Sequence, residues 1–386
     1  MNTTSTLSTL TRWTDTILIA LFMTLLWLPT LDSVFHFDRT PARNENRATT
    51  IFPKLQLGKD GVQTYVAWLE AYFNDHFGCR KCLVQWHNGL RWSLFKENNK
   101  NNSGKVLVGK QGWLFYTEEQ MIDHYSGLLQ FTPEELHGWQ VLLEKRRDWL
   151  AQRGIAYLFV VTPDKHTIYP EELPRWVTKI HPQTKLDQFF AYMREHSTVP
   201  VLDLRPAVRD AKSVHPPYKK TDTHWNSFGG FIAYQKLVPA LAHILPELKL
   251  EPMLLSSFVL TNRSEAGGDL AGFLGSSMVE SNFYSFIPKP GLREFPIKAD
   301  HPLDPHITTT TNAYANGSLI MFQDSFALAW FQFLGYHFNQ VTYLKRYDLD
   351  PARIEREKPN IVVSEMVERN FNIEDPSKLL AKEALN

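Results

Sequence analysis

Ser-Leu-Ile-Met-Phe-Gln-Asp-Ser-Phe, residues 318–326, sets the architecture expected for this chain of 386 residues. The first five residues predict a strand that ends at Gln323-Asp324-Ser325, and residues 326–335 predict a helix directly after it. In open α/β sheets, functional sites form just beyond the carboxyl ends of the strands. Ser325 occupies such a position, where a serine can serve either as a nucleophile or only as a helix cap.

Strands and helices alternate on both sides of this stretch. Residues 155–161 (IAYLFVV) form the continuous apolar run that is typical of a strand buried on both faces. Thr132-Pro133-Glu134-Glu135 is a capping-box start for a helix that runs to about Gln152. The other predicted helices and strands lie at 186–194, 199–204, 227–242, 341–344 and 360–363. This alternation predicts a parallel α/β sheet flanked by helices, whereas residues 254–306 predict only loops with short strands.

The N-terminal segment predicts an uncleaved membrane anchor. Residues 17–31 (ILIALFMTLLWLPTL) carry no charge, and the run is short for a membrane span and long for a signal-peptide core. No cleavage-site pattern follows, so a signal anchor over residues 16–31 is favoured over a cleaved signal peptide. The lysines and arginines beside this segment lean slightly against export of the C-terminal part.

Four regions are expected along the chain: a short tail (1–15), the signal anchor (16–31), a linker with a helical preface (32–104) and the main domain (105–386). Apolar residues recur at helical spacing within 62–73 and again within 83–94, which predicts the two helices of the preface.

Between these two helices stand the only two cysteines of the sequence, Cys79 and Cys82. They predict a local disulfide or two incidental thiols, with a redox pair or half of a zinc site as alternatives. Lysine plus arginine and aspartate plus glutamate balance at 41 each, which removes the electrostatic argument for nucleic acid as a partner.

Asp222-Thr223-His224-Trp225-Asn226 supplies the groups that a serine nucleophile needs. Asp222 and His224 are two residues apart, so in an extended segment both side chains lie on one face. The carboxylate can then hold one ring nitrogen of the imidazole while the other deprotonates Ser325. An aspartate capping a turn beside a loop histidine is the plainer alternative. A metal set of His215, Asp222 and His224 is another, and His166 is a further candidate base without an obvious partner.

Several motifs together resemble the alginate O-acetyltransferase AlgJ/AlgX family, whose domain is SGNH-hydrolase-like. They span residues 65–372 in the family's order, at 74–78 (NDHFG), 109–116 (GKQGWLFY), 160–165 (VVTPDK), 222–226 (DTHWN), 324–326 (DSF) and 358–363 (KPNIVV). The resemblance implies an inner-membrane-anchored, periplasmic enzyme that acetylates hydroxyl groups of an exopolysaccharide. It also implies a membrane-bound O-acyltransferase that supplies the acetyl group, and neither a cofactor nor a metal is expected.

Carried over by position, Ser325 is the nucleophile, His224 the base and Asp222 the residue that orients the base. Gln323 stands where the family has glycine, and it can crowd the turn or donate a hydrogen bond to the acyl oxygen. The Ser325 N–H is the first candidate oxyanion donor, with Arg346 and Trp225 as weaker candidates for oxyanion or substrate contact.

The chain ends soon after the predicted domain, which makes it look closer to AlgJ than to AlgX. A serine acyl-enzyme that acetylates a polysaccharide is therefore expected. The alternatives are a carbohydrate acetyl esterase and a non-catalytic polysaccharide-binding or assembly subunit.

Overall fold

The computed structural model describes residues 3–35, 52, 65, 66, 68–70, 72, 73, 78, 105–274, 276, 278–292, 294–301, 304–383 and 385. Contacts divide the chain into two units, Met1–Ser103 with Gly272–Ser276, and Gly104–Ala271 with Ser277–Asn386. The second unit carries the sheet and all the candidate site residues.

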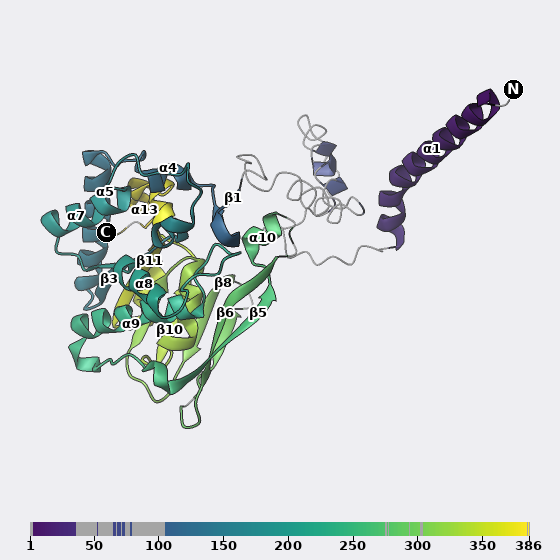
Figure 1. The fold of residues 1–386 in the computed structure, drawn as a ribbon. Helices are drawn as coiled ribbons and strands as arrows, with labels where there is room; N and C mark the ends of the chain where they lie inside the picture. Colours follow the sequence, from purple (N-terminus) through teal and green to yellow (C-terminus); the bar gives the residue numbers. More distant parts are fainter. Residues whose placement is uncertain are drawn as a thin grey trace. The chain divides into compact units, whose positions relative to one another are not determined.

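Helix α1 (Thr3–Phe35, purple in Figure 1) is the longest described element of the first unit. Its segment Trp13–Asp32, 20 residues with a mean hydropathy of 1.6, is long and apolar enough to cross a membrane. A signal sequence near the N-terminus would pass the same test, so the signal anchor stays a prediction. The described residues between 65 and 73 are helical, as their apolar spacing predicted. Cys79, Cys82 and the second predicted helix (83–94) lie outside the described residues.

A seven-stranded sheet in the order β4-β3-β11-β9-β10-β8-β7 forms the centre of the second unit. The five strands from β4 to β10 in this order are parallel, whereas β8 is antiparallel to both of its neighbours. The bounds are β3 (Ala156–Thr162), β4 (Val201–Asp203), β7 (Ile297–His301), β8 (Asp304–Thr311), β9 (Ser318–Phe322), β10 (Gln340–Leu344) and β11 (Ile361–Val367). The α/β fold is confirmed, but the sheet is mixed rather than purely parallel.

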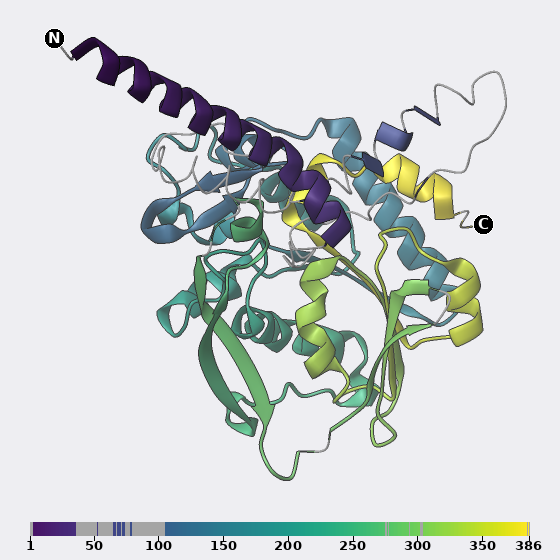
Figure 2. The same cartoon turned by 90° about the vertical axis from the view of Figure 1, so that its right-hand side faces the viewer.

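The departures from the predicted fold come from the region expected to hold loops with short strands. Besides β7 and the start of β8, it contains β5 (Phe258–Ala266) and β6 (Val279–Pro288), which pair antiparallel as a separate hairpin, with α10 (Asp269–Phe273) between them in the chain. Figure 2 shows this hairpin as long green strands. Alternate residues of β6 are buried, but two of them are Glu280 and Asn282. Polar residues at buried positions hide the alternation that normally marks a half-buried strand.

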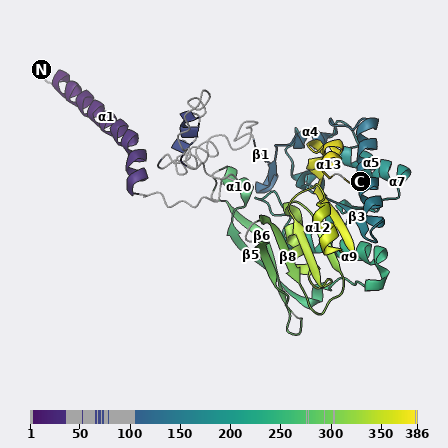
Figure 3. The same ribbon diagram turned by 180° about the vertical axis from the view of Figure 1, so that it is seen from behind.

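Helices cover both faces of the sheet because neighbouring side chains of each strand point to opposite sides. On one face, Phe159 and Val161 pack among buried residues of α5 (Pro133–Ala151), α7 (Lys185–His196), α12 (Pro351–Glu357) and α13 (Pro376–Glu383), which Figure 3 shows from behind. On the other face, Leu158 and Val160 pack with α8 (Arg205–Asp210), α9 (Ser227–Ile244), the 3-10 helix η7 (Ser325–Trp330) and α11 (Phe331–Leu334).

The remaining short elements precede or follow β3. The strands β1 (Val106–Val108) and β2 (Leu114–Tyr116) form an antiparallel hairpin, and α4 (Met121–Ser126) and α6 (Lys165–Ile168) are single short helices. The predicted capping box of α5 is confirmed: the Thr132 hydroxyl accepts from the Glu135 N–H at 3.2 Å, and the Glu135 carboxylate accepts from the Thr132 N–H at 2.8 Å. Such a cap stabilises a helix by about 1 kcal/mol.

Candidate active site

Asp222, His224 and Ser325 form one continuous chain of hydrogen bonds. His224 Nδ1 lies 2.8 Å from Asp222 Oδ1, and His224 Nε2 lies 2.7 Å from Ser325 Oγ. The His224 side chain is 28% exposed and the Asp222 side chain 13%, so the imidazole remains accessible from solvent. The structure therefore brings together the three residues that the motifs pointed to. Their arrangement is that of a nucleophile, a base and an orienting carboxylate.

Ser325 is placed by the turn that joins β9 to η7. Asp324 caps η7, because its Oδ1 accepts a hydrogen bond from the Phe326 N–H at 2.8 Å. Among the described residues, none accepts a hydrogen bond from the Ser325 N–H at the start of this helix. That N–H is therefore available to a developing oxyanion, whereas the Phe326 N–H is already used.

Asp324 also fastens this turn to the neighbouring strands. Its Oδ2 accepts from the Tyr347 hydroxyl at 2.7 Å and from the Val367 N–H at 2.8 Å, and its own N–H donates to the buried Glu365 at 2.9 Å. Burial, together with the charge of Asp324, raises the pKa of Glu365 above its usual range. The motif included Asp324, but the sequence alone indicates no role for it, since its partners follow β10 or lie in β11, far away in the chain.

His224 reaches Ser325 because α9 lies against η7. Asn226 Oδ1 accepts from the Gly229 N–H at 3.0 Å, so the helix begins directly after the histidine segment. A Cβ on Gly230 would lie 2.4 Å from the Cβ of Ala329. The absence of a side chain at Gly230 therefore permits the close approach of the two segments that carry His224 and Ser325.

Trp225 lies beneath the site. The residue is 3% exposed, its Nε1–H donates to the Phe326 carbonyl at 2.9 Å, and its ring packs against those of Phe326 and Trp330. The candidate role as a substrate or oxyanion contact does not fit this placement, because the indole donor is already used and the ring is buried. Trp225 instead supports the turn that follows Ser325.

Gln323 and Arg346 also lie outside the hydrogen-bonded chain. Gln323 is buried, its N–H donates to the Leu344 carbonyl at 2.9 Å, and its Oε1 has no hydrogen-bond partner among the described residues. Arg346 is half-exposed and forms an ion pair with Asp348. We therefore do not include either side chain in the proposed oxyanion site.

The Asp222 carboxylate is held in its ionised form. Burial acts to raise its pKa, but the hydrogen bonds from His224 and the ammonium of Lys219, 3.4 Å from Oδ2, outweigh burial and hold the pKa of Asp222 below its usual range. An ionised carboxylate accepts the Nδ1–H of His224, which leaves Nε2 free to accept the hydroxyl proton of Ser325.

Gly268→Ala is expected to displace the Asp222 carboxylate. A Cβ at Gly268 would lie 2.4 Å from Asp222 Cβ and 2.5 Å from Asp222 Oδ2, which is closer than atoms can pack. Displacement of a catalytic group by about 1 Å can lower the rate by about 100-fold. Hydrolysis of an activated acetyl ester should fall by that order in Gly268→Ala and stay unchanged in Gly138→Ala, a change within α5. Equal rates for both variants would contradict the placement of Asp222.

Asp222, His224 and Asp269 are a group of described residues that could together hold a metal ion, with ligand atoms within 4.8 Å of one another. His215, which the alternative metal set included, is not in this group, and its ring packs against Phe228 and Tyr284. Asp269 Oδ1 already accepts from the backbone N–H groups of Thr223 and Leu270, both at 2.7 Å. These contacts fit a carboxylate that fixes the loop.

His166, the further candidate base, is buried against the ring of Phe115. Burial and the neighbouring Lys165 ammonium lower the pKa of His166 to about 3. Neither ring nitrogen has a hydrogen-bond partner among the described residues. His166 is thus a neutral core residue and not a base for Ser325.

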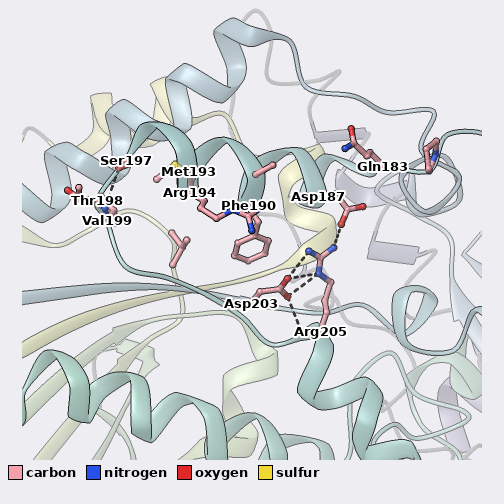
Figure 4. Close-up of a pocket in the computed structure, with 13 residues that line it drawn as sticks. Gln183, Asp187, Phe190, Met193, Arg194, Ser197, Thr198, Val199, Asp203 and Arg205 are labelled. Carbon is pink, nitrogen blue, oxygen red and sulfur yellow. Dashed lines mark hydrogen bonds and ion pairs between the residues drawn. The ribbon is translucent and has the colours of Figure 1, made fainter.

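A separate pocket lies between α7 and β4 (Figure 4). Arg205 lines this pocket and forms ion pairs with Asp187 at 2.6 Å and with Asp203 at 2.7 Å. The charges of Arg205 and these two carboxylates therefore offset one another, and none of the predicted site residues lines the pocket.

Residues 106–285 match a family described as ALGX, the SGNH hydrolase-like domain of the acetyltransferase AlgX. The chain is 27% identical over 224 residues to the probable alginate O-acetylase AlgJ of Pseudomonas aeruginosa, which covers 57% of this chain and 52% of that protein. It is 30% identical over 227 residues to the probable alginate O-acetylase AlgJ of Pseudomonas putida, covering 57% of this chain and 53% of that protein. The structure of Bacillus cereus PatB1 with a sulfonyl adduct matches with a TM-score of 0.55 and 16% identity, covering 70% of this chain and 97% of that one.

These similarities confirm the expected resemblance to the AlgJ/AlgX family and the SGNH-hydrolase-like fold. The chain spans about half the length of the curated relatives that it matches. The family match covers Asp222 and His224 but ends at residue 285, before Ser325. The position of Ser325 beside His224 is therefore independent of the family match.

Proposed function

We propose that this protein, which resembles the AlgJ/AlgX acetyltransferases, transfers acetyl groups to hydroxyl groups of an extracytoplasmic polysaccharide through an acetyl-serine intermediate on Ser325. The observation that carries the proposal is the bridge that His224 forms between Asp222 at 2.8 Å and Ser325 at 2.7 Å. The relatives named as alginate O-acetylases support the reaction class. The identity of the polymer is not carried over from them.

In the first half-reaction, Ser325 Oγ attacks the carbonyl carbon of an acetyl donor while His224 Nε2 takes the hydroxyl proton. The Asp222 carboxylate accepts a hydrogen bond from the Nδ1–H of His224 and stabilises the imidazolium. The Ser325 N–H donates to the oxyanion, and a donor of this kind is worth about 3 kcal/mol. The imidazolium then protonates the leaving group, which leaves acetyl-Ser325 and neutral His224.

In the second half-reaction, a sugar hydroxyl attacks the acetyl carbon and gives its proton to His224. The tetrahedral intermediate collapses, the acetyl group stays on the sugar, and Ser325 Oγ recovers its proton from His224. Water in place of the sugar would make the same site an esterase. The acceptor therefore separates the two activities, since both use the same three residues.

Helix α1 would anchor this reaction at the inner membrane, with the catalytic unit in the periplasm. Its apolar segment Trp13–Asp32 is long enough for that role. The resemblance implies that a membrane-bound O-acyltransferase supplies the acetyl group, and the acceptor would be a polysaccharide rather than nucleic acid.

Product analysis tests the proposal. The full-length protein in detergent is mixed with an activated acetyl ester and with neutral or uronic-acid oligosaccharides, and free acetate and acetylated sugar are measured by mass spectrometry. We expect acetylated sugar from wild type with at least one acceptor class and from Ser325→Ala with none. Acetate alone with every acceptor would favour the esterase. Neither product from wild type would favour a non-catalytic subunit.

A further inference from the structure

Lys165 is the first residue of α6, three residues after the carboxyl end of β3, and the reaction described above does not use it. It is 2% exposed. Its Nζ donates to the backbone carbonyls of Leu114 at 2.8 Å and Lys220 at 3.3 Å, and to the carbonyl of Asp222. An ammonium group has three N–H donors and no acceptor, so these three carbonyls use all of them.

The contact with Asp222 links Lys165 to the base. The carbonyl that it holds belongs to the residue whose carboxylate orients His224, and the Leu114 carbonyl belongs to β2. Lys165 therefore fixes the backbone of the Asp222 segment against both β2 and the end of β3. Without it, the carbonyls of Leu114 and Asp222 would lose this donor, whereas the Lys220 carbonyl would keep the hydrogen bond from the Leu114 N–H at 2.9 Å.

Asp164, the preceding residue, is linked to the other half of the site. Its Oδ1 accepts from Arg369 Nη1 at 2.6 Å, and its Oδ2 accepts from the Arg369 N–H at 2.8 Å. The Arg369 guanidinium in turn lies 5.3 Å from the ring of Phe326, which follows Ser325. Asp164 is thus linked through Arg369 to the turn that carries Ser325, while Lys165 holds the segment that carries Asp222 and His224.

We infer that Asp164 and Lys165 are a pair of positioning residues that holds the two halves of the site in register, with Lys165 fixing Asp222 and Asp164 fixing the turn after Ser325. This inference rests on the proposed function of Ser325 and His224. It gives a role to the Pro163-Asp164-Lys165 motif.

The surroundings of Lys165 make this arrangement sensitive to pH. Burial, with a smaller contribution from the ammonium of Lys219, lowers the pKa of Lys165 to about 8. The carboxylates of Asp222, Asp269 and Glu280 oppose this lowering of the pKa. The rings of Trp113 and Phe115 lie 5.7 and 5.8 Å from Nζ. The titratable and charged groups that face or adjoin it are Asp222, Asp269, Glu280, Lys219, Lys220 and the neutral His166.

Loss of the Lys165 proton removes one of its three donors and directs a lone pair at a carbonyl. The protonated form is the one that fits three acceptors, and it dominates below the pKa of about 8. The rate of the Ser325 reaction should therefore decline as the pH rises through that value. A Lys165→Met protein, which has no titrating group at this position, should show no such decline.

The experiment measures covalent labelling of Ser325 by phenylmethanesulfonyl fluoride in the full-length protein. Rates come from intact-protein mass spectrometry between about pH 6 and about pH 10, with the labelled residue mapped by digestion. Lys165→Met should be labelled about 10–100-fold more slowly than wild type and without the alkaline decline. Asp164→Asn should slow labelling but keep the decline.

Lys185→Met is the matched control. Lys185 is also buried, and its Nζ also donates to a backbone carbonyl, that of Phe371 at 3.4 Å, but it lies in α7. Its rate and pH profile should equal those of wild type. If circular dichroism shows that Lys165→Met does not fold, Lys165→Arg is the test variant. A guanidinium keeps its proton, so this variant should show no decline in labelling rate up to about pH 10.

The outcomes separate the two proposals. If wild type is labelled at Ser325 and Lys165→Met shows the same rate and the same alkaline decline, the positioning role is overturned and the proposed function stands. An unchanged decline in Lys165→Arg has the same meaning. Absence of labelling in wild type, under conditions that label a known serine hydrolase, overturns the proposed function itself.

Discussion

Ser325→Ala is expected to lower acetyl transfer from an activated ester by about 10⁵-fold or more. The variant lacks the oxygen that accepts the acetyl group, so only catalysis by binding and the oxyanion donor remains. The rate of product formation is measured by mass spectrometry. The free energy of unfolding should change by less than about 0.5 kcal/mol, because the change removes a single partly exposed hydroxyl.

Ser213→Ala is the control for this variant. The Ser213 hydroxyl donates to the Asp210 carbonyl at 2.8 Å at an exposed position, so its loss is a comparable local change away from the site. It should leave the transfer rate unchanged. Retention of full activity by Ser325→Ala, with loss on removal of the domain, would favour the non-catalytic subunit.

Asp222→Asn should lower the same rate by about 10⁴-fold. An asparagine can donate to Nδ1 of His224, which would place the imidazole proton on Nε2, where it can no longer take the Ser325 proton. The ion pair with Lys219, 3.4 Å away, would also be lost. The measurement is the rate of ester turnover, together with circular dichroism to verify the fold.

Asp269→Asn distinguishes the two carboxylates beside His224. Asp269 Oδ2 lies 3.9 Å from His224 Nδ1, against 2.8 Å for Asp222 Oδ1. An asparagine keeps an oxygen to accept from the N–H groups of Thr223 and Leu270, so its rate should fall by less than about 10-fold. A loss equal to that of Asp222→Asn would contradict the assignment of Asp222 as the carboxylate that orients His224.

The sequence predicted the strands whose side chains are apolar on both faces. The strands predicted at 155–161 and 318–322 are confirmed as β3 and β9, because burial between two helical layers requires a continuous apolar run. The turn after Phe322 then placed Ser325 at the carboxyl edge. These elements depend on local composition, which a single sequence contains.

The hairpin of β5 and β6 could not be predicted in the same way. Glu280 is buried in β6 because the N–H and hydroxyl of Thr221 donate to it at 2.8 and 2.7 Å. Its partner is 59 residues away in the chain, so nothing near Glu280 indicates that its charge is compensated. Long-range polar pairing of this kind is invisible to periodicity.

The candidate site likewise has features that the sequence predicts and features that it does not. Asp222, His224 and Ser325, which the structure brings together, could be predicted because their residue types and motifs carry the proposed chemistry. The sequence does not predict that Trp225 points beneath the turn, nor which carbonyls Lys165 contacts. Both depend on how α9, η7 and β2 pack around the site. The motifs therefore indicated the segments that meet in the structure and left open which of their side chains are buried beneath the site.

The measurement that bears most directly on this mechanism is intact-protein mass spectrometry of the full-length chain mixed with an activated acetyl ester. Wild type, Ser325→Ala and His224→Ala are compared side by side. We expect a transient acetyl adduct on wild type that maps to Ser325, no adduct on Ser325→Ala and much slower acetylation of His224→Ala. An adduct at another residue, or neither adduct nor ester turnover in wild type, would contradict a serine acyl-enzyme.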